Sequence, residues 1–112
     1  MIVRAWRGCA SPAHSSAYPE HFRRRVVPDL ERIEGFLGAS LLQQVRADEV
    51  EFLVLTRWQS MDSIRAFAGD KPEKAVVEPD AVAALSSFDR TVQHYEVVEE
   101  LSKPVLLNSI GV

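Results

Sequence analysis

The sequence has a single cysteine, little net charge and no long apolar run, and each of these excludes a class of protein. Cys9 alone cannot form an intramolecular disulfide framework or a cysteine metal cluster. The formal net charge of −3 provides no overall basic field for nucleic acid or an anionic membrane. Arg4 and Arg7 interrupt the first residues, and no apolar run approaches the length of a membrane span. A cytoplasmic location is therefore expected.

The composition is that of an ordinary globular protein. Hydrophobic residues make up 46% of the 112 residues and charged residues 26%, which argues against disorder. The length fits one domain with a single core of moderate size. We expect this domain to span residues 1–98. The tail, residues 99–112, contains an apolar run at 105–107 and is expected to pack on the domain or on a partner subunit.

Residues 49–58 are the clearest strand in the sequence, because branched and aromatic residues dominate and neither glycine nor proline interrupts them. Alternation places Phe52, Val54, Thr56 and Trp58 on one face, and the residues between them on the other. Both faces are apolar in the middle. The pattern is typical of a strand buried on two sides.

The remaining segments predict three more strands and two helical regions. The strands are expected at 2–8, 36–46 and 88–99, and helices at 18–34, with a kink at Pro28, and after the capping residue Ser60. Residues 73–87 are predicted as two short helical pieces divided by Pro79. The order βαββαβ predicts a ferredoxin-like α+β fold: a four-stranded antiparallel sheet with its helices on one face. Right-handed crossovers place the strands at 2–8 and 49–58 side by side in the centre.

The other face of this sheet would expose a row of apolar side chains. Val3, Ala5, Leu53 and Leu55 belong to it, and a patch of several hundred Å² is rarely left in water by a monomer. We expect a homodimer in which two sheets pack face to face, burying roughly 1,200–2,000 Å². The alternative is that the C-terminal tail covers the patch.

With this order of elements, the runs 54–60 (VLTRWQS) and 94–97 (HYEV) resemble the antibiotic biosynthesis monooxygenase family. The resemblance covers roughly residues 1–98 and implies a dimeric α+β barrel with a pocket between the sheet and the helices of each subunit. In this family some members oxidise polycyclic phenols to quinones with dioxygen and neither metal nor flavin. Others bind and degrade haem. Of the positions important in the family, Trp58 matches a tryptophan at the end of the third strand.

Haem degradation is disfavoured by the positions that the haem-degrading branch uses. That branch has an asparagine on the first strand and a histidine on the second helical segment, and these fall near Trp6 and Val77. Valine cannot ligate iron. His14 and His21 are spaced seven apart with no carboxylate to complete a metal set. We therefore expect neither a metal nor a cofactor.

Seven residues are candidates for the site. His94, on the last strand, has the chemistry to take a proton from a phenol or to hold the phenolate, and Trp58 offers a flat apolar wall and one N–H donor. These two are the predicted catalytic residues; each can also be read as ordinary core. The predicted substrate-binding residues are Arg4, Trp6, Tyr18, His21 and Phe22. Arg4 would pair with an anion or a developing oxyanion.

The leading hypothesis is a cofactor-independent monooxygenase that oxidises a small aromatic or polyketide-like compound with dioxygen. One alternative is a non-catalytic module on the same fold that binds or senses a small molecule, because the polar partners that the phenol-oxidising branch places around its tryptophan are replaced by Val54 and Ile64. A cofactor-free isomerase or lyase is another. The expected partners are a small aromatic molecule and a second copy of the chain, with no nucleic acid and no membrane.

Overall fold

The structure is a computed structural model that describes residues 1–104. The apolar run predicted to pack at 105–107 lies outside the described residues, and the part of the tail that is described, 99–104, is exposed. In chain order the elements are β1 (Ile2–Ala10), the 3-10 turn η1 (Pro12–His14), α1 (Ala17–His21), the π-helical turn η2 (Phe22–Val26), α2 (Val27–Glu31), β2 (Phe36–Val45), β3 (Val50–Trp58), α3 (Met61–Ala68), α4 (Pro79–Ala84), β4 (Ser87–Phe88) and β5 (Gln93–Glu96).

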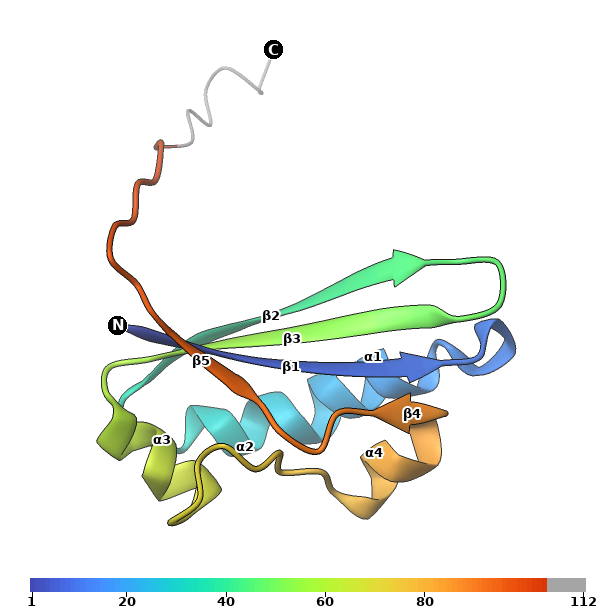
Figure 1. The fold of residues 1–112 in the computed structure, drawn as a ribbon, viewed down its shortest axis with the longest axis horizontal. Helices are drawn as coiled ribbons and strands as arrows, with labels where there is room; N and C mark the ends of the chain where they lie inside the picture. The colour runs from blue at the N-terminus through green and yellow to red at the C-terminus, as the bar shows by residue number, and fades with distance from the viewer. Residues whose placement is uncertain (105–112) are drawn as a thin grey trace.

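One antiparallel sheet forms the body of the domain, with the helices on one of its faces (Figure 1). The strand order is β2-β3-β1-β4, and β5 pairs with the same strand β1 as β4 does. The prediction that β1 and β3 lie side by side in the centre is confirmed. They run antiparallel with Arg4 opposite Thr56 and Trp6 opposite Val54. The predicted α+β, ferredoxin-like fold is confirmed, and the sheet of the single chain is open.

The last strand differs from the prediction, because it is divided into β4 and β5 and the sheet therefore has five strands rather than four. Between the two strands the chain leaves β1 and bonds to residues 73–75 instead. The amide of Ala75 donates to the carbonyl of Arg90 and the amide of Val92 to that of Glu73, each at 2.9 Å. At the break, the indole Nε1 of Trp6 donates to the carbonyl of Asp89 at 2.7 Å.

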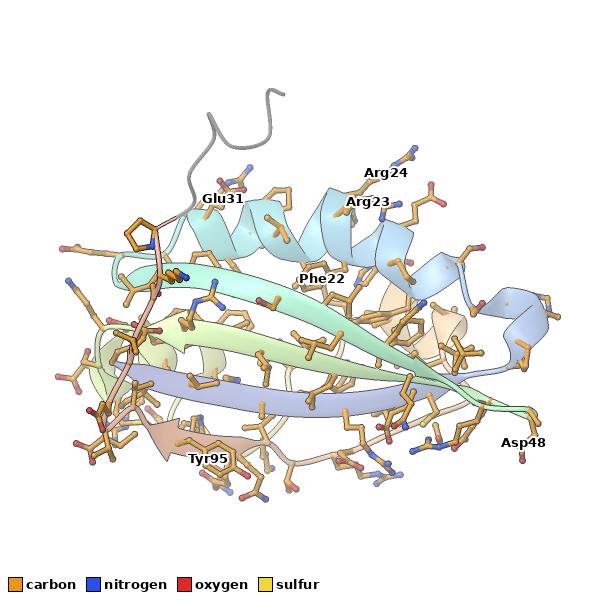
Figure 2. All side chains as sticks on the ribbon, turned by 90° about the horizontal axis from the view of Figure 1, so that it is seen from above. Phe22, Arg23, Arg24, Glu31, Asp48 and Tyr95 are labelled. Carbon is orange, nitrogen blue, oxygen red and sulfur yellow. The ribbon has the colours of Figure 1, made fainter. Side chains whose placement is uncertain are left out.

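The first helical region is continuous but not uniform. The π-helical turn η2 separates α1 from α2 and lies directly before Pro28, which is where the proline ring was expected to disturb the helix. Figure 2 shows Phe22 pointing toward the sheet, whereas Arg23, Arg24 and Glu31 lie on the outer side of the helix. Gly35 ends the region with a φ of 92°, the left-handed conformation that favours glycine.

The second half of the chain follows the prediction at α3 and departs from it afterwards. The hydroxyl of Ser60 accepts a hydrogen bond from the amide of Ser63 at 3.2 Å, as expected of the helix cap. The two helical pieces predicted in residues 73–87 are wrong in part: only α4 is helical, since residues 73–75 are engaged by the chain between β4 and β5. In the described part of the chain, no helix is long and apolar enough to cross a membrane.

The burial of β3 alternates as predicted. Phe52, Val54, Thr56 and Trp58 are buried under the helices, and the residues between them are half-buried. On the face without helices, Val3, Ala5, Leu53 and Leu55 are half-buried, while Leu42 and Tyr95 are 43% and 58% exposed. Figure 2 shows Tyr95 on β5, at the side of the sheet opposite the first helical region.

Candidate functional site

A cavity of about 90 Å³ lies between the helix-covered face of the sheet and the helices. Its floor is the centre of β1 and β3, and its walls come from α1, η2, α2, α3, α4, the chain before α4 and the chain between β4 and β5. The lining side chains are those of Arg4, Trp6, Tyr18, His21, Val26, Asp29, Leu30, Val54, Thr56, Phe67, Val76, Glu78, Ala81 and Val92. Most of this lining is apolar, with a small number of polar groups, which is the usual composition of a site for a small organic molecule.

Arg4 is the most buried charged residue that lines the cavity, being only 5% exposed. It donates through Nη1 to the carbonyl of Pro72 and through Nη2 to that of Lys74, the latter at 2.9 Å. Its Cζ lies 5.7 Å from the ring centroid of Phe67. Within residues 1–104, Arg4 forms no ion pair with a carboxylate. Burial lowers the pKa of Arg4 to about 10, so the guanidinium remains charged at neutral pH.

One N–H of Arg4 remains available. Its Nε bonds to no group of the described chain, whereas Nη1 and Nη2 are both engaged. Since no fully buried side-chain nitrogen or oxygen in the described residues lacks a partner, this Nε is not fully buried, and it belongs to a side chain that lines the cavity. A buried guanidinium with a free donor and no carboxylate partner is suited to receive an anionic oxygen.

His94 lies beside Arg4 and not in the cavity, contrary to the placement expected from the sequence. Its Nε2 is 3.1 Å from Nη1 of Arg4. Because arginine only donates, Nε2 must accept, which fixes a neutral imidazole with its proton on Nδ1. Burial and the charge of Arg4 lower the pKa of His94, against an opposing effect of Glu73. The ring borders a separate surface depression with Met1, Gln59 and Met61.

Tyr18, His21 and Trp6 form an aromatic wall of the cavity. The ring centroid of Tyr18 lies 5.8 Å from that of Trp6 and 5.9 Å from that of His21. Tyr18 is 3% and His21 8% exposed, and neither side chain forms a hydrogen bond within residues 1–104. Burial, with the nearby carboxylate of Glu78, raises the pKa of Tyr18 well above its usual value. Its hydroxyl is therefore a neutral hydrogen-bonding group at physiological pH.

Two predicted site residues belong to the core instead. Trp58 is 0% exposed and packs with Leu30 and Ile64. It stacks on Phe67 with ring centroids 5.7 Å apart, and its Nε1 donates to Oγ1 of Thr56 at 2.8 Å. Trp58 thus lies behind three residues of the cavity lining, Leu30, Thr56 and Phe67, and is not part of it. Phe22 likewise packs in the core cluster that contains Tyr18, Phe52 and Val54.

Of the seven predicted residues, the structure therefore brings Arg4, Trp6, Tyr18 and His21 together at the cavity. Sequence reasoning missed Asp29 and Glu78, the two carboxylates that line it. Asp29 lies between Pro28 and Leu30 in the first helical region. Its position next to the apolar residues of that region could have indicated that it lies near the cavity. Glu78 lies in the segment whose structure was predicted wrongly, and no sequence pattern pointed to it.

The lining residues do not fit a haem. Val77, the residue near the position of the family's iron ligand, packs against the core cluster and does not line the cavity. His21, the imidazole of residues 1–104 that does line it, belongs to a different element, and the volume of about 90 Å³ is small for a macrocycle. The described residues contain no group of three or more histidine, cysteine, aspartate or glutamate side chains that could hold a metal ion.

A family model described as antibiotic biosynthesis monooxygenase matches residues 1–79. No curated protein matches the chain. Among solved structures, a Bacillus cereus protein described by the same family name has a TM-score of 0.65 at 19% identity, over 91% of this chain and 97% of that one.

Two further structures are similar, and their described functions differ. A haem-degrading protein from Mycobacterium tuberculosis has a TM-score of 0.56 at 26% identity, covering 92% of this chain and 98% of that one. A cofactor-independent oxygenase from Streptomyces nogalater has a TM-score of 0.59 at 15% identity, covering 91% and 98%. At these identities, similarity establishes the fold and leaves the reaction to be argued from the residues.

Proposed function

This chain belongs to the antibiotic biosynthesis monooxygenase family, and from that premise we propose that it oxidises a small phenolic compound with dioxygen in the cavity between sheet and helices. The observation that carries the proposal is the buried guanidinium of Arg4, which lines the cavity, has no carboxylate partner in residues 1–104 and retains a free Nε donor. Such a group stabilises negative charge most strongly where water is excluded.

In the proposed reaction the phenol first becomes a phenolate. His21 lines the cavity and forms no hydrogen bond with the described residues, so its imidazole is the candidate proton acceptor. The phenolate oxygen lies against Arg4, and its ring gives one electron to dioxygen. Superoxide and the phenoxyl radical then combine into a peroxide on a ring carbon. Loss of water from this peroxide leaves a carbonyl, so one phenol and one dioxygen give one quinone and one water.

His94 has a different role here from the one expected from the sequence. It bonds to Nη1 of Arg4 and does not line the cavity, so we assign it as a positioning residue and not as the holder of the phenolate. Trp58 acts further back, by supporting Phe67 and Thr56. Both proposals concern the geometry of Arg4 and of the lining, and neither residue touches the substrate.

Oxygen uptake by the purified protein with a panel of hydroquinones and naphthols tests the reaction. We expect Arg4→Gln to lower turnover about 10²-fold, the usual effect of removing one oxyanion donor. Arg7→Gln is the matched control, because Arg7 lies on the same strand but is exposed and pairs with Glu51; it should retain turnover within about twofold. Absence of uptake above background across the panel would contradict the proposal.

A second candidate is a module that binds a phenol without oxidising it. The small, mostly apolar cavity with one cation favours this candidate, because such a site is sufficient for binding. Saturable binding of a phenol without oxygen uptake would support it. Turnover under nitrogen would instead support a cofactor-free isomerase or lyase.

We also propose that the protein is a cytoplasmic homodimer formed through the open face of the sheet. This face presents Val3, Ala5, Leu53 and Leu55 half-buried, with Leu42 at its side 43% exposed. Two such faces packed together would bury roughly 1,200–2,000 Å², which is enough for a stable interface. Sedimentation at micromolar concentration tests this; a species of 12.6 kDa would contradict it.

A further inference from the structure

Three charged residues line the cavity, and they are separated by depth. Arg4 on β1 is 5% exposed and is the most buried of the three. Asp29 on α2 is exposed, and Glu78, directly before α4, is half-buried. The cavity therefore has a cation at its inner end and two carboxylates toward its opening.

The guanidinium of Arg4 forms no ion pair with either of the two carboxylates. Among the ion pairs of residues 1–104, none involves Arg4, Asp29 or Glu78. Two further polar side chains on the lining, Tyr18 and His21, are more than nine-tenths buried and form no hydrogen bond with the described residues. Because no fully buried side-chain nitrogen or oxygen of the described residues lacks a partner, the polar atoms of these two residues are accessible, and they are free to bond a ligand in the cavity that both residues line.

We propose that the cavity selects a phenol that carries a basic amine at the end remote from its phenolic oxygen; this inference rests on the proposed function and names its substrate class. The phenolic oxygen meets Arg4 at the inner end. The ammonium group meets Asp29 and Glu78 near the opening. A carboxylate in place of the amine faces two like charges, which disfavours its binding.

The size of the cavity limits the substrate further. At about 90 Å³ the enclosed space holds at most a single aromatic ring, so a polycyclic compound is disfavoured and a side chain must extend through the opening. The ring packs against the aromatic wall formed by Trp6 and Tyr18. A side chain of two or three carbons would carry a terminal charge toward the opening.

Three simple phenols that differ mainly in this terminal group test the proposal: tyramine, 4-ethylphenol and 3-(4-hydroxyphenyl)propanoate, which are cationic, neutral and anionic. Calorimetric dissociation constants under nitrogen separate binding from oxidation. We expect tyramine to bind about 3- to 10-fold more tightly than 4-ethylphenol at low ionic strength, because exposed charges contribute modestly. The anionic phenol should bind weakest, and added salt should reduce the differences.

Variants assign the preference to the two carboxylates. Asp29→Asn combined with Glu78→Gln should bring the three dissociation constants within about twofold of one another. Asp80→Asn is the matched control, since Asp80 lies two residues after Glu78 and does not line the cavity; it should leave the order unchanged. Equal binding of the three phenols by the natural protein, or an order that survives the double substitution, overturns the inference and leaves phenol oxidation standing. Failure of all three phenols to bind overturns the inference, while oxygen uptake with the panel of hydroquinones and naphthols decides phenol oxidation separately.

Discussion

The two faces of the central strands β1 and β3 carry different kinds of side chain, although they share one backbone. On the face covered by helices, Arg4, Trp6 and Thr56 interrupt an otherwise apolar surface and line a cavity. On the other face, Val3, Ala5, Leu53 and Leu55 form a plain apolar surface with no cavity residue among them. The comparison teaches that apolar burial alone predicts a contact surface. A functional site is instead indicated by polar side chains that are buried at a cavity.

The largest expected effect comes from the core beneath the cavity. Trp58→Ala removes a fully buried indole that packs with Leu30, Ile64 and Phe67. We expect the free energy of unfolding to fall by about 3–5 kcal/mol, the usual result of truncating a buried aromatic residue. Urea denaturation measures this. Val82→Ala, on α4 and 47% exposed, is the control away from the proposed interface and should lower the free energy of unfolding far less; equal losses for the two variants would contradict the prediction.

The second effect concerns the open face. Leu55→Glu places a carboxylate in the middle of the apolar surface, where two copies of the chain are proposed to meet. Burying an unpaired charge is unfavourable enough that we expect the dissociation constant of the dimer to rise at least about 100-fold. Sedimentation equilibrium measures it. Thr91→Glu, at an exposed position between β4 and β5, serves as the control and should leave association unchanged.

A smaller effect is expected at the cap of α3, which carries Phe67 to the cavity. Ser60→Ala removes the acceptor of the Ser63 amide, and the loss of such a cap destabilises by about 1 kcal/mol. Thermal unfolding measures this. Ser60→Asp should restore most of the stability, because an aspartate side chain accepts the same hydrogen bond. If Ser60→Ala left the thermal stability unchanged, the cap would not contribute to the stability of α3, and the prediction would be wrong.

The smallest effect is expected in the pH dependence of stability. The pKa of His94 is lowered in the folded protein, mainly by burial and then by Arg4, so the unfolded chain binds the proton more readily. The stabilisation from neutral His94 is therefore complete above the unfolded pKa of about 6.5 and is lost as the pH falls through the lower folded value. Below pH 6.5 we expect the Tm to fall further than in His94→Gln, whose amide oxygen still accepts from Arg4. Parallel Tm curves for the two proteins would contradict this.

Much of the fold was predictable because β3 carries a strong pattern. Its alternation fixed both faces, and the caps at Ser60 and Gly35 set helix boundaries. The break between β4 and β5 was not predictable, since it depends on contacts with residues 73–75 far away in sequence. That same contact withdrew 73–75 from the predicted helix, so the two errors have a single cause.

The candidate site was predictable in part. Arg4, Trp6, Tyr18 and His21 lie where the periodicity of the first strand and helix placed them. His94 lies opposite Arg4 on the neighbouring strand and bonds to it, but it does not line the cavity. The pattern of a single strand does not show which residue of a neighbouring strand its side chain will contact. Trp58 followed from the alternation as a buried residue. Nothing in the alternation distinguishes a side chain beneath a cavity from one that lines it.

The interruption between β4 and β5 has a consequence for how copies of this chain can assemble. β4 has two residues and β5 four, and the chain between them bonds inward to residues 73–75. A short and broken border offers few consecutive amide and carbonyl groups to a foreign strand. Fibril growth by strand addition along this margin is thereby discouraged, even in a protein whose broad apolar surface favours self-association.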